Sequence, residues 1–306
     1  MYSVEVKKLT VKFDDFIAVD DISFFVNRGE IFGFLGANGA GKTTTIRVLC
    51  GLLRPTAGDV LVGGMGFDTG EDAIKSKVGY MSQKFTLYDD MTIKENLAFT
   101  GSLRKIERKK LKRRITELFE FIGFDRSVNE MVKDLPGGIK QQISLVASLL
   151  HDPEIIFLDE PTAGVTPAHR ARFWDLIRKL SGQGKTLFVT THYMDEAEEC
   201  ERLALMRTGK IIAIDSPKDL KKSTFPEPLY ELSYDEKTTK KGWLDKMKAT
   251  PSVLSVQPYG RRYHVSFKNE SAATTVRNEL GHGFSMKKIP PSLEDVFIKL
   301  VEGDER

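Results

Sequence analysis

The sequence contains very little cysteine. Its 306 residues include two, Cys50 and Cys200, and neither lies in the spacing of a metal-binding or redox motif. A framework of disulfide bonds is therefore not expected, and a reducing compartment fits this usage best. The stability must come from apolar side chains, which make up 41% of the chain and suffice for one large domain or two smaller ones.

Long apolar runs are also missing. No window approaches the roughly 18 uninterrupted apolar residues of a bilayer-spanning helix. Residues 1–6 lack the charged and apolar segments of an export signal, so we expect any membrane role to depend on a partner. A large excess of one sign of charge is also missing, because the formal net charge is only +3. This gives no strong basic field and neither implies nor excludes nucleic acid.

A glycine-rich loop between a predicted strand and a predicted helix is the strongest feature present. The strand is expected at 30–35 and the helix at 43–50, and the loop reads Gly36-Ala37-Asn38-Gly39-Ala40-Gly41-Lys42-Thr43-Thr44. Glycines let backbone N–H groups turn inward around an anion, and the helix N-terminus adds partial positive charge. Lys42 can then reach the β- and γ-phosphates, and the Thr43 hydroxyl can bind Mg²⁺. A turn with an incidental lysine is the alternative, but every fixed position of a phosphate loop is present.

Two carboxylates and a histidine are expected near this loop. Asp159 and Glu160 end one apolar run, and His192 follows another at 186–191. In parallel α/β sheets, ligands bind beyond the carboxyl ends of the strands, where the phosphate loop also lies. Asp159 can hold Mg²⁺ or its water, Glu160 can orient or deprotonate an attacking water, and His192 can contact the γ-phosphate. An acidic pair or a lone histidine would be weak evidence without the loop.

Three further features are ambiguous on their own. Phe13, in the polar link between two predicted strands, could stack on a purine, although such an aromatic usually belongs to the core. Gln83 follows the predicted strand at 78–81 and could bind water or a metal-bound oxygen, although surface glutamines usually bind nothing specific. Gly137 and Gly138 open a predicted helix and could present N–H groups to a second phosphate, or form only a turn.

The chain is expected to have two domains. Apolar residues at helical spacing and a basic run at 104–114 indicate an inserted helical subdomain over about 91–150, whose basic face is solvated or contacts acidic lipid headgroups. A charged, proline-containing stretch at 217–228 is interpreted as a linker, which gives a first domain at 1–222 and an accessory domain at 223–306.

The accessory domain is predicted to have the element order βαββαβ, followed by a terminal helix at 293–301. This order suggests a small α+β domain of the ferredoxin-like type. Its strands are expected at 229–234, 252–259, 261–267 and 284–289, and its first two helices at 240–249 and 270–281.

Together these segments resemble the ATPase subunit of an ABC transporter over about residues 2–220. The resemblance implies an α/β fold with a P-loop NTPase (RecA-like) core, an antiparallel β subdomain and the inserted α-helical subdomain. It identifies the loop 36–44 as Walker A, Gln83 as the Q-loop, 135–142 as the signature, 155–159 as Walker B, Glu160 as the catalytic glutamate and His192 as the switch histidine.

The resemblance also assigns the site residues. For ATP they are Phe13 (the adenine-stacking position), Gly36, Asn38, Gly39, Ala40, Gly41, Lys42, Thr43, Thr44 and Asp159. For Mg²⁺ they are Thr43, Gln83 and Asp159, and for catalysis Glu160, His192 and Gln83. Leu135, Pro136, Gly137 and Gly138 would serve the site of a second subunit.

The function implied by the resemblance is hydrolysis of MgATP coupled to transport, with closure and opening of a head-to-tail dimer driving a membrane partner. The partners would be a second ATPase subunit and integral membrane permease subunits, at the inner face of the cell membrane, and no nucleic acid is expected. Segments 193–198 and 291–297 resemble the exporter subfamily for drugs, polysaccharides or lipids.

Two positions depart from the family pattern. Pro136 replaces the usual signature serine, and Thr166 replaces an aspartate, so both changes affect the parts of the site shared between subunits. A regulatory, weakly hydrolysing half of a heterodimer is therefore a second hypothesis. A soluble ABC-type ATPase acting on ribosomes or DNA is a third, although such relatives usually carry two ATPase modules or a long coiled coil.

Overall fold

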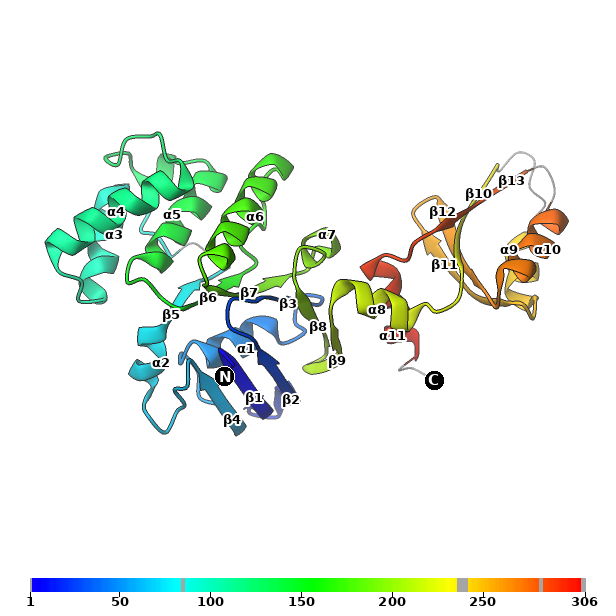
Figure 1. The fold of residues 1–306 in the computed structure, drawn as a ribbon, viewed down its shortest axis with the longest axis horizontal. Coiled ribbons are helices and arrows are strands. Elements are labelled where there is room, and N and C mark those ends of the chain that lie inside the picture. Colours follow the sequence, from blue (N-terminus) through cyan, green and yellow to red (C-terminus); the bar gives the residue numbers. More distant parts are fainter. Residues whose placement is uncertain (1, 84–85, 236–241, 281–282, 304–306) are drawn as a thin grey trace. The chain divides into compact units, whose positions relative to one another are not determined.

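The computed structural model describes residues 2–83, 86–235, 242–280 and 283–303. The chain forms two compact units, Met1–Pro217 and Lys218–Arg306, each with its own hydrophobic core (Figure 1). Among the helices of the described residues, none combines the length and apolar character needed to cross a bilayer.

The first unit is built on a six-stranded sheet of order β5-β6-β7-β3-β8-β9. All neighbours are parallel except the hairpin β8–β9. Every residue of β3, β6 and β7 is buried, which explains the mostly apolar sequences of β3 and β6, while β7 has threonines at Thr186, Thr190 and Thr191. The strands are β3 (Ile31–Leu35), β5 (Val78–Met81), β6 (Ile155–Asp159), β7 (Thr186–Thr191), β8 (Arg202–Arg207) and β9 (Lys210–Asp215).

The first unit also contains a smaller antiparallel sheet and, outside the helical subdomain, four helices. The small sheet has the order β2-β1-β4 and shares one hydrophobic cluster with α1 and one face of the large sheet. The strands are β1 (Val4–Phe13), β2 (Phe16–Val26) and β4 (Ala57–Val62), and the helices are α1 (Lys42–Leu49), α2 (Glu71–Lys77), α6 (Pro167–Gly182) and α7 (Met194–Ala197). Phe13 is the last residue of β1, so the prediction that it lies in a polar link was wrong.

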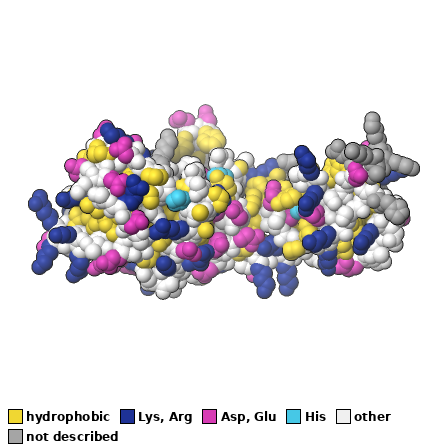
Figure 2. Space-filling view, turned by 90° about the horizontal axis from the view of Figure 1, so that it is seen from above, with side chains coloured by type: hydrophobic (Ala, Val, Ile, Leu, Met, Phe, Trp, Pro, Cys, Tyr) yellow, Lys and Arg dark blue, Asp and Glu magenta, His cyan; other side chains and the backbone are white. Residues whose placement is uncertain are grey.

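The helical subdomain lies between β5 and β6 in the chain. It comprises α3 (Ile93–Leu103), α4 (Arg108–Ile122), a 3₁₀ turn η1 (Val132–Asp134) and α5 (Gly137–Leu149), which share the second hydrophobic cluster with α6. Its basic run is largely exposed, and Lys and Arg side chains gather at the left end of Figure 2, where α3 and α4 lie in Figure 1. Arg104 is an exception, because it donates to the carbonyl of Lys75 over 2.7 Å.

The second unit contains an antiparallel sheet of order β11-β12-β10-β13. Its described elements follow the expected order βαββαβ and a terminal helix, and the ferredoxin-like classification stays a prediction. They are β10 (Leu229–Tyr234), α9 (Trp243–Ala249), β11 (Val253–Tyr259), β12 (Arg262–Phe267), α10 (Glu270–Leu280), β13 (Phe284–Ile289) and α11 (Leu293–Gly303), and one further helix, α8 (Pro217–Thr224), precedes them. Residues 240, 241 and 281 of the predicted helices lie outside the described residues.

The stretch interpreted as a linker is helical over Pro217–Thr224, so that prediction was wrong. Leu220 is 4% exposed and Phe225 is 6% exposed, and burying these side chains favours a packed helix over an extended linker. A single leucine among lysines and an aspartate gives too little periodicity for this helix to be found from the sequence. The two compact units divide between Pro217 and Lys218, at the start of this stretch, and the domain boundary at 222/223 stays a prediction.

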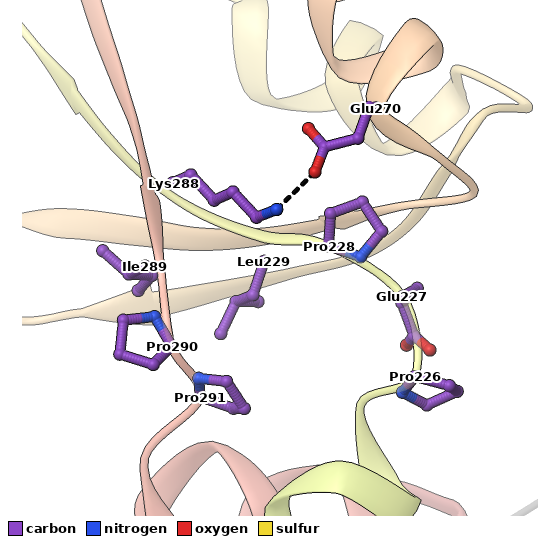
Figure 3. A pocket seen from close by; sticks show the side chains of 9 residues that line it. All are labelled: Pro226, Glu227, Pro228, Leu229, Glu270, Lys288, Ile289, Pro290 and Pro291. Carbon is purple, nitrogen blue, oxygen red and sulfur yellow. Dashed lines mark hydrogen bonds and ion pairs between the residues drawn. The ribbon is translucent and has the colours of Figure 1, made fainter.

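A cavity of about 550 Å³ opens in the second unit where β10 begins and β13 ends (Figure 3). Apolar side chains of Leu229 and Ile289 and four prolines line it, and the ion pair of Lys288 with Glu270 lies at one side. The prolines are Pro226, Pro228, Pro290 and Pro291. Proline has no backbone N–H, so these positions offer a ligand only carbonyl oxygens and apolar rings.

Helix α11 begins with a reciprocal cap. The Asp295 carboxylate accepts from the Ser292 N–H over 2.8 Å, while the Ser292 hydroxyl oxygen accepts from the Asp295 N–H over 3.2 Å. The other Asp295 oxygen lies 2.6 Å from Nδ1 of His264 on β12. Both side chains are at least 90% buried, so this pair fixes the start of α11 on the sheet.

We expect Asp295→Ala to destabilise the second unit by about 2–4 kcal/mol, because it removes a helix cap and leaves the buried His264 ring without its partner. Hydrogen–deuterium exchange of the amides of α11 and β12 measures this loss. The matched control is Glu279→Ala, which removes an exposed carboxylate of α10 and should change the free energy of unfolding by less than about 0.5 kcal/mol. Equal exchange in both variants would show that the pair does not hold α11.

Candidate active site

The loop 36–41 turns from the carboxyl end of β3 into α1, and two of its glycines lie where there is no room for a side chain. A Cβ at Gly36 would lie 2.3 Å from the Met206 carbonyl oxygen, and one at Gly41, where φ is +107°, would lie 2.6 Å from that of Ala18. No side chain caps the N-terminus of α1. The exposed tip of the loop, Asn38 and Gly39, and the N-terminal end of α1 therefore form a position suited to an anion.

Lys42 folds back over this loop. Its Nζ donates to the carbonyl oxygens of Gly36 and Ala37 over 2.7 and 3.2 Å, and the residue is 4% exposed. Burial lowers the pKa of Lys42, while the nearby carboxylates of Glu160 and Asp159 oppose that shift. A buried ammonium that is only partly compensated favours an additional anion beside it.

Asp159 ends β6 and is 1% exposed. Its Oδ1 accepts hydrogen bonds from the hydroxyls of Thr43 over 3.2 Å and Thr190 over 2.6 Å. Its Oδ2 is buried and has no hydrogen-bond partner among the described residues. Burial raises the pKa of Asp159, and the two hydroxyls oppose this. A carboxylate oxygen without a partner next to a threonine hydroxyl fits a hard divalent cation such as Mg²⁺.

Glu160 brings three predicted site residues together. Its Oε2 accepts from Nε2 of Gln83 over 3.0 Å and lies 3.2 Å from Nδ1 of His192, which is close enough for an ion pair but not aligned for a hydrogen bond. Its Oε1 lies 3.5 Å from Nζ of Lys42. The carboxylate thus occupies the middle of the site and interacts with the lysine, the glutamine and the histidine at once.

The backbone of Glu160 is held in an uncommon conformation. Its φ is +48°, a left-handed region that costs a non-glycine residue about 1–3 kcal/mol. Its N–H donates to both the carbonyl oxygen and the hydroxyl of Thr190, over 3.1 and 3.0 Å. These bonds to β7 maintain the turn that aims the carboxylate at Lys42.

Phe13 and the signature segment are not part of this cluster. Phe13 is 44% exposed at the end of β1, where it pairs with Phe16 of β2. Pro136 is the N-cap of α5 and provides no side-chain cap for Gly137 and Gly138, while Leu135 before it is 5% exposed.

The turn at residues 135–138, called the signature turn below, instead lies against the start of α6. A Cβ at Gly138 would be 2.5 Å from the ring of His169, whose Nδ1 lies 2.9 Å from the Thr166 hydroxyl oxygen. Neither His169 nor the positioning hydroxyl of Thr190 was predicted from the sequence. A threonine inside an apolar strand gives no signal that separates it from ordinary core residues.

Comparison with known proteins agrees with this geometry. A family model described as ABC transporter matches residues 19–163. A probable multidrug ABC transporter ATP-binding protein of Escherichia coli (strain K12) is 43% identical over 235 residues, which cover 76% of this chain and 41% of that protein. The chain therefore spans less than half the length of this relative.

Two further proteins are similar along more of their own length. Nod factor export ATP-binding protein I of Cupriavidus pinatubonensis is 33% identical over 304 residues, covering 99% of this chain and 92% of that protein. A solved ATP-binding cassette, a dimer in a post-hydrolysis state bound to ADP and Pi, superposes with a TM-score of 0.64 at 24% identity over 70% of this chain and 98% of the cassette. The chain thus belongs to the family of ABC transporter ATP-binding proteins, and its first unit has their P-loop NTPase fold with an inserted helical subdomain.

Proposed function

We propose that the chain binds and hydrolyses MgATP and thereby powers an ABC transporter, an exporter by analogy with its multidrug and Nod factor relatives. The observation that carries this proposal is the meeting of Lys42, Asp159, Glu160 and His192 beyond the carboxyl ends of three neighbouring strands, β3, β6 and β7. That is the position at which open α/β sheets bind their ligands.

In the proposed complex, backbone N–H groups of the loop and of the start of α1 surround the phosphates. The residues that contribute to this binding site are Gly36, Asn38, Gly39, Ala40, Gly41, Thr43 and Thr44. Lys42 exchanges its bonds to two loop carbonyls for the β- and γ-phosphates, a stronger, charge-assisted interaction. Phe13 stacks on the adenine ring, a role that its 44% exposure leaves open to it.

Thr43, Gln83 and Asp159 would hold Mg²⁺, which when bound neutralises charge that develops on the phosphates. Once Lys42 binds phosphate, Glu160 is released from its ammonium and can accept a proton from the attacking water at a carboxylate oxygen. His192, already beside Glu160, would contact the γ-phosphate, and Gln83 would orient the water or the metal-bound oxygen.

The proposed partners are a second ATPase subunit and integral membrane permease subunits at the inner face of the cell membrane. The solved cassette similar to this chain is a dimer, which supports the first of these partners. Leu135, Pro136, Gly137 and Gly138 would complete the site of the second subunit, with Gly137 and Gly138 as backbone donors. We propose that residues 1–222 form the ATPase module and residues 223–306 an accessory domain.

A second candidate is the regulatory half of a heterodimer, and Pro136 favours it. Proline lacks the hydroxyl that a serine would offer to a phosphate, and it also brings no backbone N–H to the turn before α5. Thr166, in place of the family's aspartate, is engaged with His169 of its own chain.

We expect Glu160→Gln to lower kcat for MgATP hydrolysis by about 100-fold or more, because a carboxamide cannot accept the proton of the attacking water. ATP affinity should stay within about threefold, since the phosphate loop is unchanged. Release of inorganic phosphate and equilibrium binding of ATP give the two quantities. The control Glu154→Gln removes an exposed carboxylate just before the amino end of the same strand and should keep wild-type activity. Full activity of Glu160→Gln would refute this role.

We expect Pro136→Ser to raise turnover about tenfold, because one added hydrogen bond to a phosphate is worth about 1.4 kcal/mol. The measurement is the rate of ATP hydrolysis by wild type and variant, each alone and mixed with a partner ATPase that has the Leu-Ser-Gly-Gly signature. A wild type that binds ATP but hydrolyses it only in the mixture would favour the heterodimer. A variant no faster than wild type under both conditions would show that the missing hydroxyl does not limit turnover.

A further inference from the structure

A second buried carboxylate lies behind the proposed catalytic residues. Glu196 belongs to the short helix α7, which follows His192, and it is 2% exposed. Its Oε1 accepts the hydroxyl of Thr162, and its Oε2 accepts that of Thr191 over 2.8 Å. Both threonines are at most 2% exposed, so the two carboxylate oxygens each serve a buried donor.

Arg170 connects the same carboxylate to α6. Its Nε lies 3.1 Å from Oε1 of Glu196, and its guanidinium group donates to Asp195 over 3.2 Å. The guanidinium carbon lies 4.0 Å above the ring of Tyr193, and that ring in turn lies 4.0 Å from the ring of His192. Arg170 therefore contacts three residues of the segment that follows His192, namely Tyr193, Asp195 and Glu196.

The three partners of Glu196 belong to three segments with different tasks in the proposed reaction. Thr162 is two residues after Glu160, and Thr191 directly precedes His192. Arg170 lies in the first turn of α6, where the neighbouring His169 packs against Gly138 of the signature turn. Glu196 thus contacts the segment that follows Glu160, the segment that carries His192, and the helix α6 that packs against Gly138.

We propose that Glu196 is a positioning residue that fixes the loop 160–166, His192 and the start of α6 relative to one another. This inference rests on the proposed function. Through these contacts, a γ-phosphate bound beside Glu160 and His192 also sets the position of the signature turn. The role needs both carboxylate oxygens, since a glutamine side chain of the same size has one acceptor and turns an amide N–H₂ toward a second donor.

The first test compares Glu196→Gln with Glu199→Gln. Glu199 lies on the same segment and also pairs with an arginine of α6, Arg178, but this pair is on the surface, with both side chains 44% exposed. We expect Glu196→Gln to lower kcat about 10- to 100-fold, as loss of a supporting hydrogen bond does at other sites. KM for ATP should stay within about threefold, because no phosphate contact is lost. Glu199→Gln should match the wild type in both quantities.

A second pair of variants separates positioning from simple stability. Thr162→Val removes the hydroxyl while keeping the shape, and it should reproduce the loss seen in Glu196→Gln. Thr162→Ser keeps the hydroxyl and should retain most of the activity. Because the Thr162–Glu196 hydrogen bond is lost in both single variants, the double variant Glu196→Gln/Thr162→Val should be slowed by less than the product of the two single losses. Thermal unfolding of each variant shows whether the protein remains folded.

Hydrogen–deuterium exchange with and without MgATP decides the inference independently of turnover. In the wild type, MgATP should protect the amides of the loop 160–166, of residues 191–197 and of the start of α6 from exchange. In Glu196→Gln, MgATP should protect the amides of the loop 160–166 alone. The inference is overturned by an unchanged protection pattern, or by a loss of kcat that merely follows the loss of folded protein. A wild type that binds ATP but hydrolyses none, alone or with partners, would instead refute the proposed function, and the exchange pattern would still test Glu196.

Discussion

The arrangement of the candidate site depends on one buried hydroxyl group. Thr190, fully buried on β7, donates to the Asp159 carboxylate and accepts the N–H of Glu160. It thereby holds two neighbouring carboxylates in different directions, one toward Thr43 and one toward Lys42. Without such bonds, a left-handed glutamate and two adjacent acidic side chains would be unfavourable in this position. The rest of the proposed chemistry follows from this separation of the metal-binding and water-activating roles.

Lys42 and Glu160 explain how the site can respond to a nucleotide. The ammonium group is bound to loop carbonyls and lies 3.5 Å from the carboxylate, so its charge is already partly compensated within the chain. When a phosphate binds Lys42 in place of Glu160, the carboxylate of Glu160 keeps its contacts with Gln83 and His192 and becomes available to water. Such an exchange of one anionic partner for another can change the position of the loop after β6 without a large rearrangement.

The sequence predicted the elements whose residues carry a local signal. In loop 36–44, Gly36 and Gly41 lie where another backbone segment approaches closely, and the buried strand β6 is apolar up to Asp159. Helix α8 was missed because its burial depends on tertiary contacts of a single leucine. Thr190 and Glu196 could not be assigned roles, since a hydroxyl in a strand or a glutamate in a short helix acquires its meaning only from partners distant in the chain.

The central claim is that one chain supplies the phosphate loop and a second supplies the signature turn at a working ATP site. The specific rate of MgATP hydrolysis, measured against the concentration of the purified chain, tests it most directly. For a homodimer, the rate per chain should rise with concentration at the dilute end and then level off, and it should require Mg²⁺. Bound MgATP with a rate per chain that is independent of concentration across the range over which the dimer dissociates would contradict the claim.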